Sequence, residues 1–316
     1  MRSPIIYFRY TLAGLLILLS YTQGYNQDKP THIWPVKLQK NYIKSFPLSS
    51  ETVHLQNRFG QLVIDTWSKN EISVEAHITV SAESNDYAKQ VLDNIQVLDT
   101  KQKDSISFIT HLDNWDKPTN EYSGGHEIHI DYLVHLPVKA KLFAENSFGP
   151  MTIGNYSGEC ELLEKYGTLT AGKLENCASL SVSFGKLVVE SVHNSKLELS
   201  YSQIDIGKLS GAIQAKFAFC NSIDMPIDNS VTRYDLQNAY TSLYFVLPKD
   251  FTGDYEINTY NARLSSNILP IKEEDNLTAS FKSNAFNINH HYRGNFGKPG
   301  GSQIHISSRF GNIRFL

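Results

Sequence analysis

The stretch that decides the fold begins at Asn146 and extends to the phrase Thr259-Tyr260-Asn261. In it a small or polar residue, an aromatic residue and another small or polar residue precede a mostly apolar run, again and again. The copies read Ser147-Phe148-Gly149, Lys165-Tyr166-Gly167, Ser183-Phe184-Gly185, Ser200-Tyr201-Ser202, Ala218-Phe219-Cys220, Ala239-Tyr240-Thr241 and Thr259-Tyr260-Asn261. Their aromatic residues are separated by 18, 18, 17, 18, 21 and 20 residues. A fixed period near 20 with one turn phrase per step predicts the stacked coils of a β-solenoid.

The segments between the phrases carry a strand pattern. Leu197 and Leu199 alternate with polar neighbours, as do Ile204 and Ile206, and such alternation places the apolar set on one face of a strand. A single coil cannot close a core, whereas stacked coils can. We therefore expect each recurring aromatic ring to stack on the next at the strand spacing of roughly 4.7–4.9 Å. The glycine behind it would supply a positive φ or a close approach at the corner.

The sequence thus predicts an all-β chain: a single-stranded, β-helix-like β-solenoid of roughly 18–21-residue coils, with one short α-helix near the N-terminus. A β-sandwich with evenly spaced strands is the competing fold. The later copies are less regular, because Cys220-Asn221-Ser222 and Asn261-Ala262-Arg263 lack the glycine.

Length and composition indicate an ordered chain. It has 316 residues, of which 19% are charged and 11% aromatic, with a net charge of −3. A nucleic-acid partner usually requires a basic patch, so we expect no nucleic-acid binding.

Residues 1–24 resemble a secretory signal peptide, with Arg2, Arg9 and the apolar run Leu15–Leu19. Its removal would change the net charge to −5, because it carries two arginines and no acid. The run is too short for a confident membrane span, although an uncleaved anchor is the alternative. We expect no transmembrane span in the mature chain, and export to the periplasm, the outer membrane surface or the medium.

The rest of the chain divides by pattern. Residues 25–50 are polar and proline-containing and predict a linker, and residues 51–145 predict strands with the short helix. In that helix Tyr87, Val91 and Ile95 would share one face, with Ser84 or Asn85 as the cap. Residues 146–275 form the repeats, and residues 276–316 are expected to form C-terminal coils and a closing strand.

The two ends of the mature chain carry the same phrase. Arg58-Phe59-Gly60 near the start is echoed by Arg309-Phe310-Gly311 near the end. This predicts one continuous coil with terminal rungs that block edge-to-edge pairing.

Three stretches resemble a known family. They are Asp93–Val97 after the predicted helix, Ile130–Pro137 running into Leu142–Gly149, and Ile304–Ile306 running to Gly311–Ile313. On these the chain resembles the adhesin-like β-strand-repeat domain of unknown function found in exported Bacteroidota-type proteins. The resemblance covers most of residues 51–316. It implies a β-solenoid of the cell envelope without established catalytic residues.

One strand carries candidate metal ligands. Alternation places Glu127, His129, Asp131 and His135 on one face of the segment from His126 to Leu136. Imidazole and carboxylate groups suit zinc, but one strand spreads them widely and a solvent-facing row explains them as well. We therefore predict no metal site and no cofactor, with these four as weak candidates.

The cysteines leave one question open. Cys160 and Cys177 lie about one coil apart, and Cys220 stands alone. Export permits a disulfide, but directly stacked strands give poor geometry for one, and buried free thiols are the alternative.

Candidate enzymatic groups do not recur in phase. Glu164, Glu190, Asp205 and Asp224 fall at different points of the repeat, whereas β-helical enzymes acting on acidic polysaccharides need acids stacked on one face. Exposed Tyr and Asn side chains would be candidates for stacking on sugars, with solvent-facing ladder residues as the alternative; they are Tyr156, Tyr234, Asn238, Tyr244 and Tyr255.

These observations favour an exported, non-enzymatic envelope protein that binds a partner, glycan or protein, as an adhesin-like module. A periplasmic scaffold or sensing protein linked to envelope signalling is the first alternative. A polysaccharide-acting β-helix enzyme is the second. The aromatic residues Phe59, Phe148, Tyr166, Phe184, Tyr201, Phe219, Tyr240, Tyr260 and Phe310 are expected to be structural.

Overall fold

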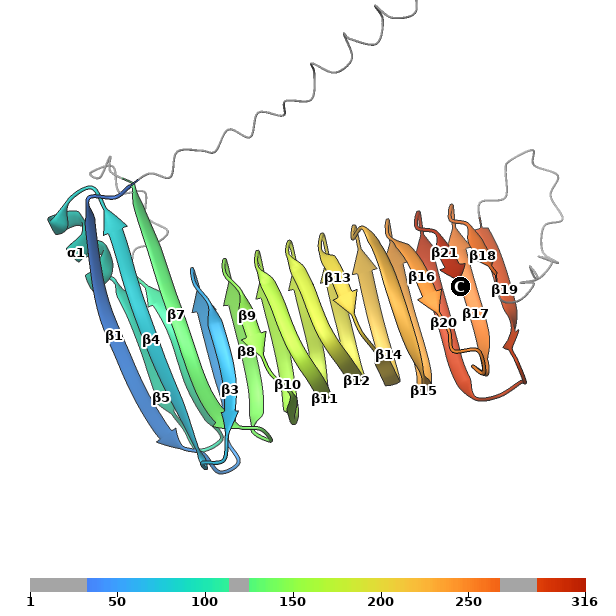
Figure 1. Ribbon diagram of the computed structural model, residues 1–316, viewed down its shortest axis with the longest axis horizontal. Helices are drawn as coiled ribbons and strands as arrows, with labels where there is room; N and C mark the ends of the chain where they lie inside the picture. Colours follow the sequence, from blue (N-terminus) through green and yellow to red (C-terminus); the bar gives the residue numbers. More distant parts are fainter. Residues whose placement is uncertain (1–32, 114–124, 268–288) are drawn as a thin grey trace, which may run out of the picture. The chain divides into compact units, whose positions relative to one another are not determined.

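The computed structural model describes residues 33–113, 125–267 and 289–316, and the part from Pro35 to Leu316 forms one unit. Its strands lie side by side in one row (Figure 1), and the described residues contain one helix. The predicted all-β class with a short helix near the N-terminus is confirmed. The signal peptide at 1–24 lies outside the described residues.

The strands fall into two sets on either side of the recurring turn. The pre-turn strands are β6 (Ser105–Leu112), β2 (Thr52–Arg58), β8 (Lys141–Ser147), β10 (Tyr156–Lys165), the second halves of β11 (Thr168–Ser183) and β12 (Lys186–Ser200), β14 (Leu209–Ala218), the second half of β15 (Ser222–Ala239), β20 (Ser302–Arg309) and β17 (Gly253–Tyr260). Each pairs in parallel with the next in that order.

The post-turn strands are likewise parallel. They are β7 (His126–Pro137), β3 (Leu62–Trp67), β9 (Met151–Ile153), the first halves of β11 and β12, and β13 (Gln203–Ile206); the first part of β15, β16 (Ser242–Val246), β21 (Ile313–Phe315) and β18 (Leu264–Ser266) form a second paired group. Inward side chains of the two sets meet in the core. Tyr234 of β15, for example, packs edge-on against Phe245 of β16, with ring centroids 5.8 Å apart.

Antiparallel strands pair at both ends of the row. β1 (Val36–Pro47) pairs with β4 (Glu71–Ala82), which pairs with β7, and β5 (Ile95–Lys101) pairs with β6. At the other end β19 (Asn289–Phe296) pairs with β17. The linker expected over 25–50 therefore differs from the structure, because alternate residues of β1 pack against the core while the others face solvent.

The helix α1 (Asn85–Asp93) begins as predicted. Ser84 is its N-cap and its hydroxyl accepts a hydrogen bond from the Tyr87 amide at 3.3 Å. Its most buried face differs from the prediction: Ala88 and Leu92 are buried, whereas Tyr87 is only half-buried. Ile95 belongs to β5.

The turns between the two sets form a ladder of stacked rings. Eight aromatic residues occupy it: Phe59, Phe148, Tyr166, Phe184, Tyr201, Phe219, Tyr240 and Phe310. Neighbouring centroids lie 4.6–5.2 Å apart with interplanar angles of 1–10°. We call these eight residues the aromatic ladder.

The aromatic residue itself, not the glycine behind it, adopts the left-handed conformation. All eight ladder residues have φ between 50° and 65°, a region that costs a non-glycine residue about 1–2 kcal/mol. Stacking in such pairs contributes about 0.5–1.5 kcal/mol and so offsets much of this cost. In the coil of Tyr260 the left-handed residue is Asn261, so Tyr260 is not a ladder member and meets Phe310 edge-on at 80°.

The glycine after the ring is required by close approach. A Cβ at Gly167 would lie 2.0 Å from the carbonyl oxygen of Gly149, and one at Gly185 would lie 2.0 Å from that of Gly167. Where the glycine is replaced, the new side chain takes part in the turn: the hydroxyl of Ser202 accepts a hydrogen bond from the Gly185 amide at 3.2 Å.

The two Arg-Phe-Gly coils are not terminal rungs. β20, which carries Arg309, pairs with β15 on one side and β17 on the other. The last coil of the chain therefore lies between two coils that precede it in the sequence. Likewise β2 lies between β6 and β8, and β3 between β7 and β9. The echo noted in the sequence therefore marks an inserted coil at each end.

Polar side chains beneath the ladder satisfy the turn carbonyls. The Asn146 amide donates to the Gly149 carbonyl at 2.9 Å, the Asn238 amide to the Thr241 carbonyl at 2.7 Å, and the Ser308 hydroxyl to the Gly311 carbonyl at 2.7 Å. Glu164 occupies the equivalent place in its coil, fully buried next to Asn146. Burial raises the pKa of its carboxyl to about 8.

Candidate functional site

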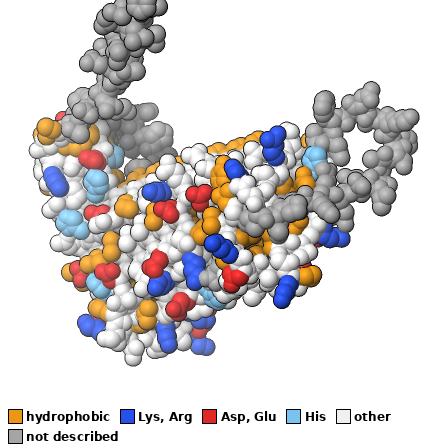
Figure 2. All heavy atoms as spheres, turned by 45° about the vertical axis from the view of Figure 1, so that its right-hand side comes forward, with side chains coloured by type: hydrophobic (Ala, Val, Ile, Leu, Met, Phe, Trp, Pro, Cys, Tyr) orange, Lys and Arg blue, Asp and Glu red, His pale blue; other side chains and the backbone are white. Residues whose placement is uncertain are grey.

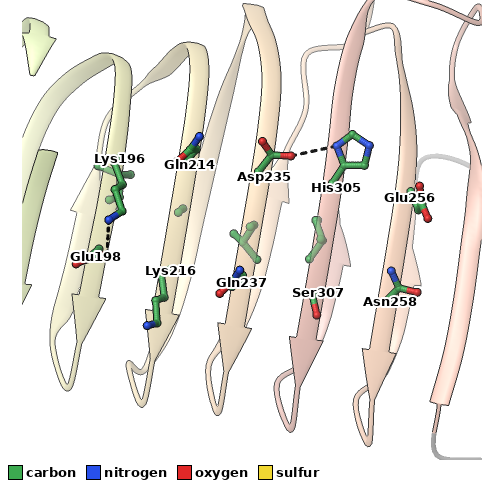
Figure 3. A pocket seen from close by; sticks show the side chains of 14 residues that line it. Lys196, Glu198, Gln214, Lys216, Asp235, Gln237, Glu256, Asn258, His305 and Ser307 are labelled. Atoms are coloured by element: carbon green, nitrogen blue, oxygen red, sulfur yellow. Dashed lines mark hydrogen bonds and ion pairs between the residues drawn. The ribbon is translucent and has the colours of Figure 1, made fainter. Parts of the chain in front are cut away.

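A groove of about 650 Å³ crosses the outer face of the pre-turn strands. Its walls come from β12, β14, β15, β20 and β17, five neighbours in the parallel sheet (Figure 3). Buried Leu197, Ala215, Leu236 and Ile306 contribute to its lining. The groove therefore exists only because the last coil of the chain, with β20, lies inside the sheet.

The strand alternation builds two polar rows in the groove. The upper row in Figure 3 is Lys196, Gln214, Asp235, His305 and Glu256, each the register partner of the next. The lower row is Glu198, Lys216, Gln237, Ser307 and Asn258, in register in the same way. Inward neighbours of these residues fill the core, so the rows must face solvent.

Charged groups in the upper row are held by ion pairs. Asp235 Oδ2 lies 2.6 Å from Arg233 Nε, and Asp235 Oδ1 lies 3.2 Å from His305 Nδ1. The hydrogen bond from Arg233 holds the pKa of Asp235 below its usual range. Glu256 Oε1 lies 3.5 Å from Arg293 Nη2 and 3.3 Å from His291 Nε2.

The lower row is richer in uncharged groups. Lys196 of the upper row reaches down to Glu198 at 2.7 Å, and the next charged group is Lys216. Gln237, Ser307 and Asn258 then present amide and hydroxyl groups, which donate and accept hydrogen bonds. The surface seen in Figure 2 likewise mixes basic and acidic groups.

This arrangement suits the binding of a polar, extended ligand. Donors and acceptors recur at the strand spacing of roughly 4.8 Å along two rows, and the groove is open to solvent along the sheet. The carboxyl of Asp235 is held in its ionised form by Arg233, which suits hydrogen-bond acceptance and not proton donation. The carboxyl with a raised pKa, Glu164, is buried in the core away from the lining.

The candidate metal ligands lie on one face of β7 as predicted, but they have different partners. Glu127 pairs with His129 at 3.0 Å, Asp131 accepts a hydrogen bond from the backbone N–H of Gln61 at 3.0 Å, and His135 stacks on Trp67 at 5.1 Å. Among the described residues no group of three His, Cys, Asp or Glu side chains is placed to hold a metal ion.

Most residues considered for sugar stacking are buried, so that interpretation of them is wrong. Tyr156 and Tyr234 are 1% exposed, and Asn238 and Tyr255 are also buried. Each points inward, because it occupies one of the alternate strand positions whose side chains are buried in the core. Tyr244 alone is half-exposed.

The carboxylates and cysteines singled out in the sequence lie at separate places in the fold. Glu190 forms an ion pair with Lys173 at 3.3 Å, Asp205 lies on β13, and Asp224 lies on β15. Cys160 and Cys177 are register partners in neighbouring coils, as expected from their spacing. All three cysteines are free and buried.

The groove residues were not identified from the sequence, although a signal existed. They lie five and three positions before each left-handed turn residue: Lys196 and Glu198 before Tyr201, Asp235 and Gln237 before Tyr240. No residue type recurs at these positions, and the insertion of β20 between β15 and β17 is not visible in the repeat.

No model of a known protein family and no curated protein matches the sequence. Solved structures similar to the chain include a proposed adhesin from Bacteroides fragilis (TM-score 0.37, 10% identity, 88% of this chain and 97% of that one). Others are a proposed lipid binding protein from Parabacteroides distasonis (0.33, 10%, 87% and 96%) and a proposed cell adhesion protein from Clostridium sporogenes (0.25, 12%, 88% and 99%).

The descriptions of the Bacteroides and Clostridium structures are of the adhesin-like kind that the resemblance implies. At such identities and TM-scores this likeness carries no argument about what the chain binds. In the part of the chain that the structure describes, no helix has the length and apolar character needed to cross a membrane.

Proposed function

We propose that the chain is an exported β-solenoid that acts as a non-enzymatic binding module, with the groove across β12, β14, β15, β20 and β17 as its ligand surface. The observation that carries this is the pair of polar rows on five neighbouring strands around a groove of about 650 Å³. The parallel pairing of successive coils and the aromatic ladder support the solenoid. The signal-like residues 1–24 support export.

The ligand class that fits best is a glycan chain. Gln214, Gln237 and Asn258 offer paired donors and acceptors to hydroxyl groups. A groove that runs across strands fits a linear polymer better than a compact molecule. The mixed charges of Lys216 and Asp235 favour a ligand without a strong net charge of either sign.

A glycan array tests the proposal. The wild-type chain should bind a subset of neutral glycans, and Gln214→Ala, Gln237→Ala and Asn258→Ala together should remove that binding. Ser179→Ala with Ser181→Ala is the matched control, because both serines lie in the same two rows on β11 but outside the groove. The proposal would be contradicted if the serine control lost as much glycan binding as the groove variant, or if the groove variant bound glycans as well as the wild-type chain.

A polysaccharide-acting enzyme is the second candidate. Asp235 and Glu256 lie in the same row on either side of His305, so they are two strand spacings apart, roughly 9.6 Å. This backbone spacing lies just beyond the roughly 6.5–9.5 Å that separates the carboxyl groups of inverting glycosidases. Release of reducing ends from any glycan that the array identifies, and its loss in Glu256→Gln, would favour this candidate instead.

Location separates an adhesin from a periplasmic scaffold or sensing protein. Protease treatment of intact cells followed by blotting for the chain is the measurement. Digestion on intact cells agrees with adhesion. Survival until the cells are permeabilised would overturn the adhesin role and leave the groove to a periplasmic partner.

A further inference from the structure

The aromatic ladder is a long, partly exposed apolar feature outside the groove. Seven of its rings, from Phe148 to Phe310, are each 42–52% exposed. They stack face to face, so each presents its edge to solvent and not its face. Monomeric proteins rarely expose contiguous apolar stripes of this size without a partner.

The composition of the ladder is amphipathic. Tyr166, Tyr201 and Tyr240 alternate with phenylalanines along the stack, so hydroxyl groups recur among fully apolar edges. Tyrosine and other aromatic residues with this mixed character gather where proteins meet the boundary between lipid headgroups and acyl chains. Small residues flank the middle rings, among them Ser183, Ser200 and Ala218, and leave the edges unobstructed.

The exposed charges nearest to the ladder rings along the sequence are of one sign. Within two positions of any ladder ring stand Arg58, Lys165, Lys186 and Arg309, and all these positions belong to the described residues. The carboxyl of Glu164 is also that close, but it is buried beneath the turn. Lys165 is partly neutralised, because its ammonium lies 3.0 Å from Glu145.

These charges argue against a second copy of the chain. Pairing two ladders in parallel places Arg58 against Arg58, and pairing them in opposite directions places Arg58 against Arg309. Either arrangement brings cations together, while the nearest acids, Glu145 and Asp131, are already bonded to Lys165 and to the Gln61 backbone N–H, so the pairing is unfavourable. An anionic, planar surface has neither problem.

We propose that the aromatic ladder is an edge that docks on an anionic lipid surface. The ring edges enter the interfacial region, and Arg58, Lys186 and Arg309 contact the lipid phosphates. Neighbouring rings stack with interplanar angles of 1–10°, so their edges form one continuous row that a bilayer surface can meet. The groove lies on the outer face of the pre-turn strands, so the docked chain would still offer it to a ligand.

Vesicle flotation of the full chain tests this inference. Wild-type chain should float with vesicles of phosphatidylcholine and phosphatidylglycerol and stay behind with phosphatidylcholine alone. Phe184→Asn, Tyr201→Asn and Phe219→Asn together should lower the bound fraction by about tenfold or more, since interfacial binding scales with buried apolar area. Asparagine tolerates the left-handed turn, as Asn194 and Asn261 show with φ of 51° and 50°.

A second variant keeps the test independent of the turns. Arg58→Gln, Lys186→Gln and Arg309→Gln together leave the middle rings in place and should remove the preference for anionic vesicles. Lys173→Gln, Lys208→Gln and Lys249→Gln is the control, because it removes the same charge from exposed sites away from the ladder and should bind as wild type.

Three outcomes would overturn the inference: wild-type chain that does not float with anionic vesicles, a charge variant that floats as well as its control, and a concentration-dependent dimer lost in the ring variant. The last would assign the edge to a second copy. Failure of glycan binding leaves this inference untouched, because the ladder and the groove share no lining residue.

Discussion

Phe310 stacks on Tyr240 with ring centroids 4.8 Å apart, although Tyr260 is the aromatic residue that follows Tyr240 in the repeat. The last coil of the chain is therefore built into the sheet between β15 and β17. Its buried side chains contact coils on both sides, so the stability of the end of the sheet depends on the final fifteen residues.

Ile306→Ala should destabilise the chain strongly. Ile306 is 2% exposed on β20, opposite Leu236 and Ile257, and a buried Ile→Ala change costs about 2–5 kcal/mol. Urea unfolding followed by circular dichroism measures the free energy of unfolding. Ile43→Ala, at a site 68% exposed on β1, should cost no more than about 0.5 kcal/mol; equal losses would contradict the inserted position of β20.

Gly167→Ala should also destabilise the chain, for a steric reason. The new methyl group would meet the Gly149 carbonyl oxygen at 2.0 Å, and relieving such overpacking costs about 1–3 kcal/mol. Gly154→Ala provides the control, because nothing lies within 4 Å of its Cβ position. Thermal melts measure the Tm of both variants. A Tm of Gly154→Ala that is lowered as much as that of Gly167→Ala would refute the steric explanation.

Stability should fall as pH rises through the range set by Glu164. Its carboxyl pKa is raised from 4.5 to about 8 in the folded chain, so between these values the folded state binds the extra proton and stability decreases with pH. Below 4.5 both states are protonated, and the stabilisation is fully present. Glu164→Gln should flatten the Tm against pH between 4.5 and about 8. Glu198→Gln, at the groove surface, should leave the wild-type slope, and an unchanged slope in Glu164→Gln would refute the assignment.

The cysteines should react with a thiol reagent only after unfolding. Cys160 and Cys177 are buried and neighbouring, and a hydrogen bond between the two thiols, together with burial, raises the pKa of Cys160, so little thiolate is present to react. Mass spectrometry after labelling in buffer and in denaturant should give three labelled cysteines only in the second case. A missing pair of labels under non-reducing denaturation would instead reveal a disulfide.

The regular part of the fold could be predicted because one local event repeats. Phe148, Tyr166 and Phe184 each occupy the same left-handed turn and stack on the next ring, so the turn leaves a periodic mark in the sequence. Strand β1 left no such mark, since its alternation over residues 36–47 lies among prolines and polar residues that also suit a linker. The sequence also does not show that the aromatic residue, and not the glycine after it, adopts the positive φ. The glycine is needed because the backbone of the neighbouring coil passes close to it.

The order of the coils and the site could not be predicted for a shared reason. Parallel strands in register accept almost any neighbour with an apolar inner face, so Arg309-Phe310-Gly311 does not encode whether it follows Tyr260 or precedes it. The groove depends on that order. Asp235 and His305 lie far apart in the sequence and form their hydrogen bond only because β20 pairs with β15.

Between Phe148 and Tyr240 each coil adds one ring to the ladder and pairs in parallel with the next, which makes length an adjustable quantity. Duplication or loss of one whole coil in this stretch would leave the inserted coils at both ends in their present surroundings. Each such event would change the distance between the ends by roughly 4.8 Å, the strand spacing, and would add or remove one ring and one pair of positions in the two outward rows. Gene-level repetition can thus tune the reach of the protein in fixed increments while its end assemblies stay unchanged.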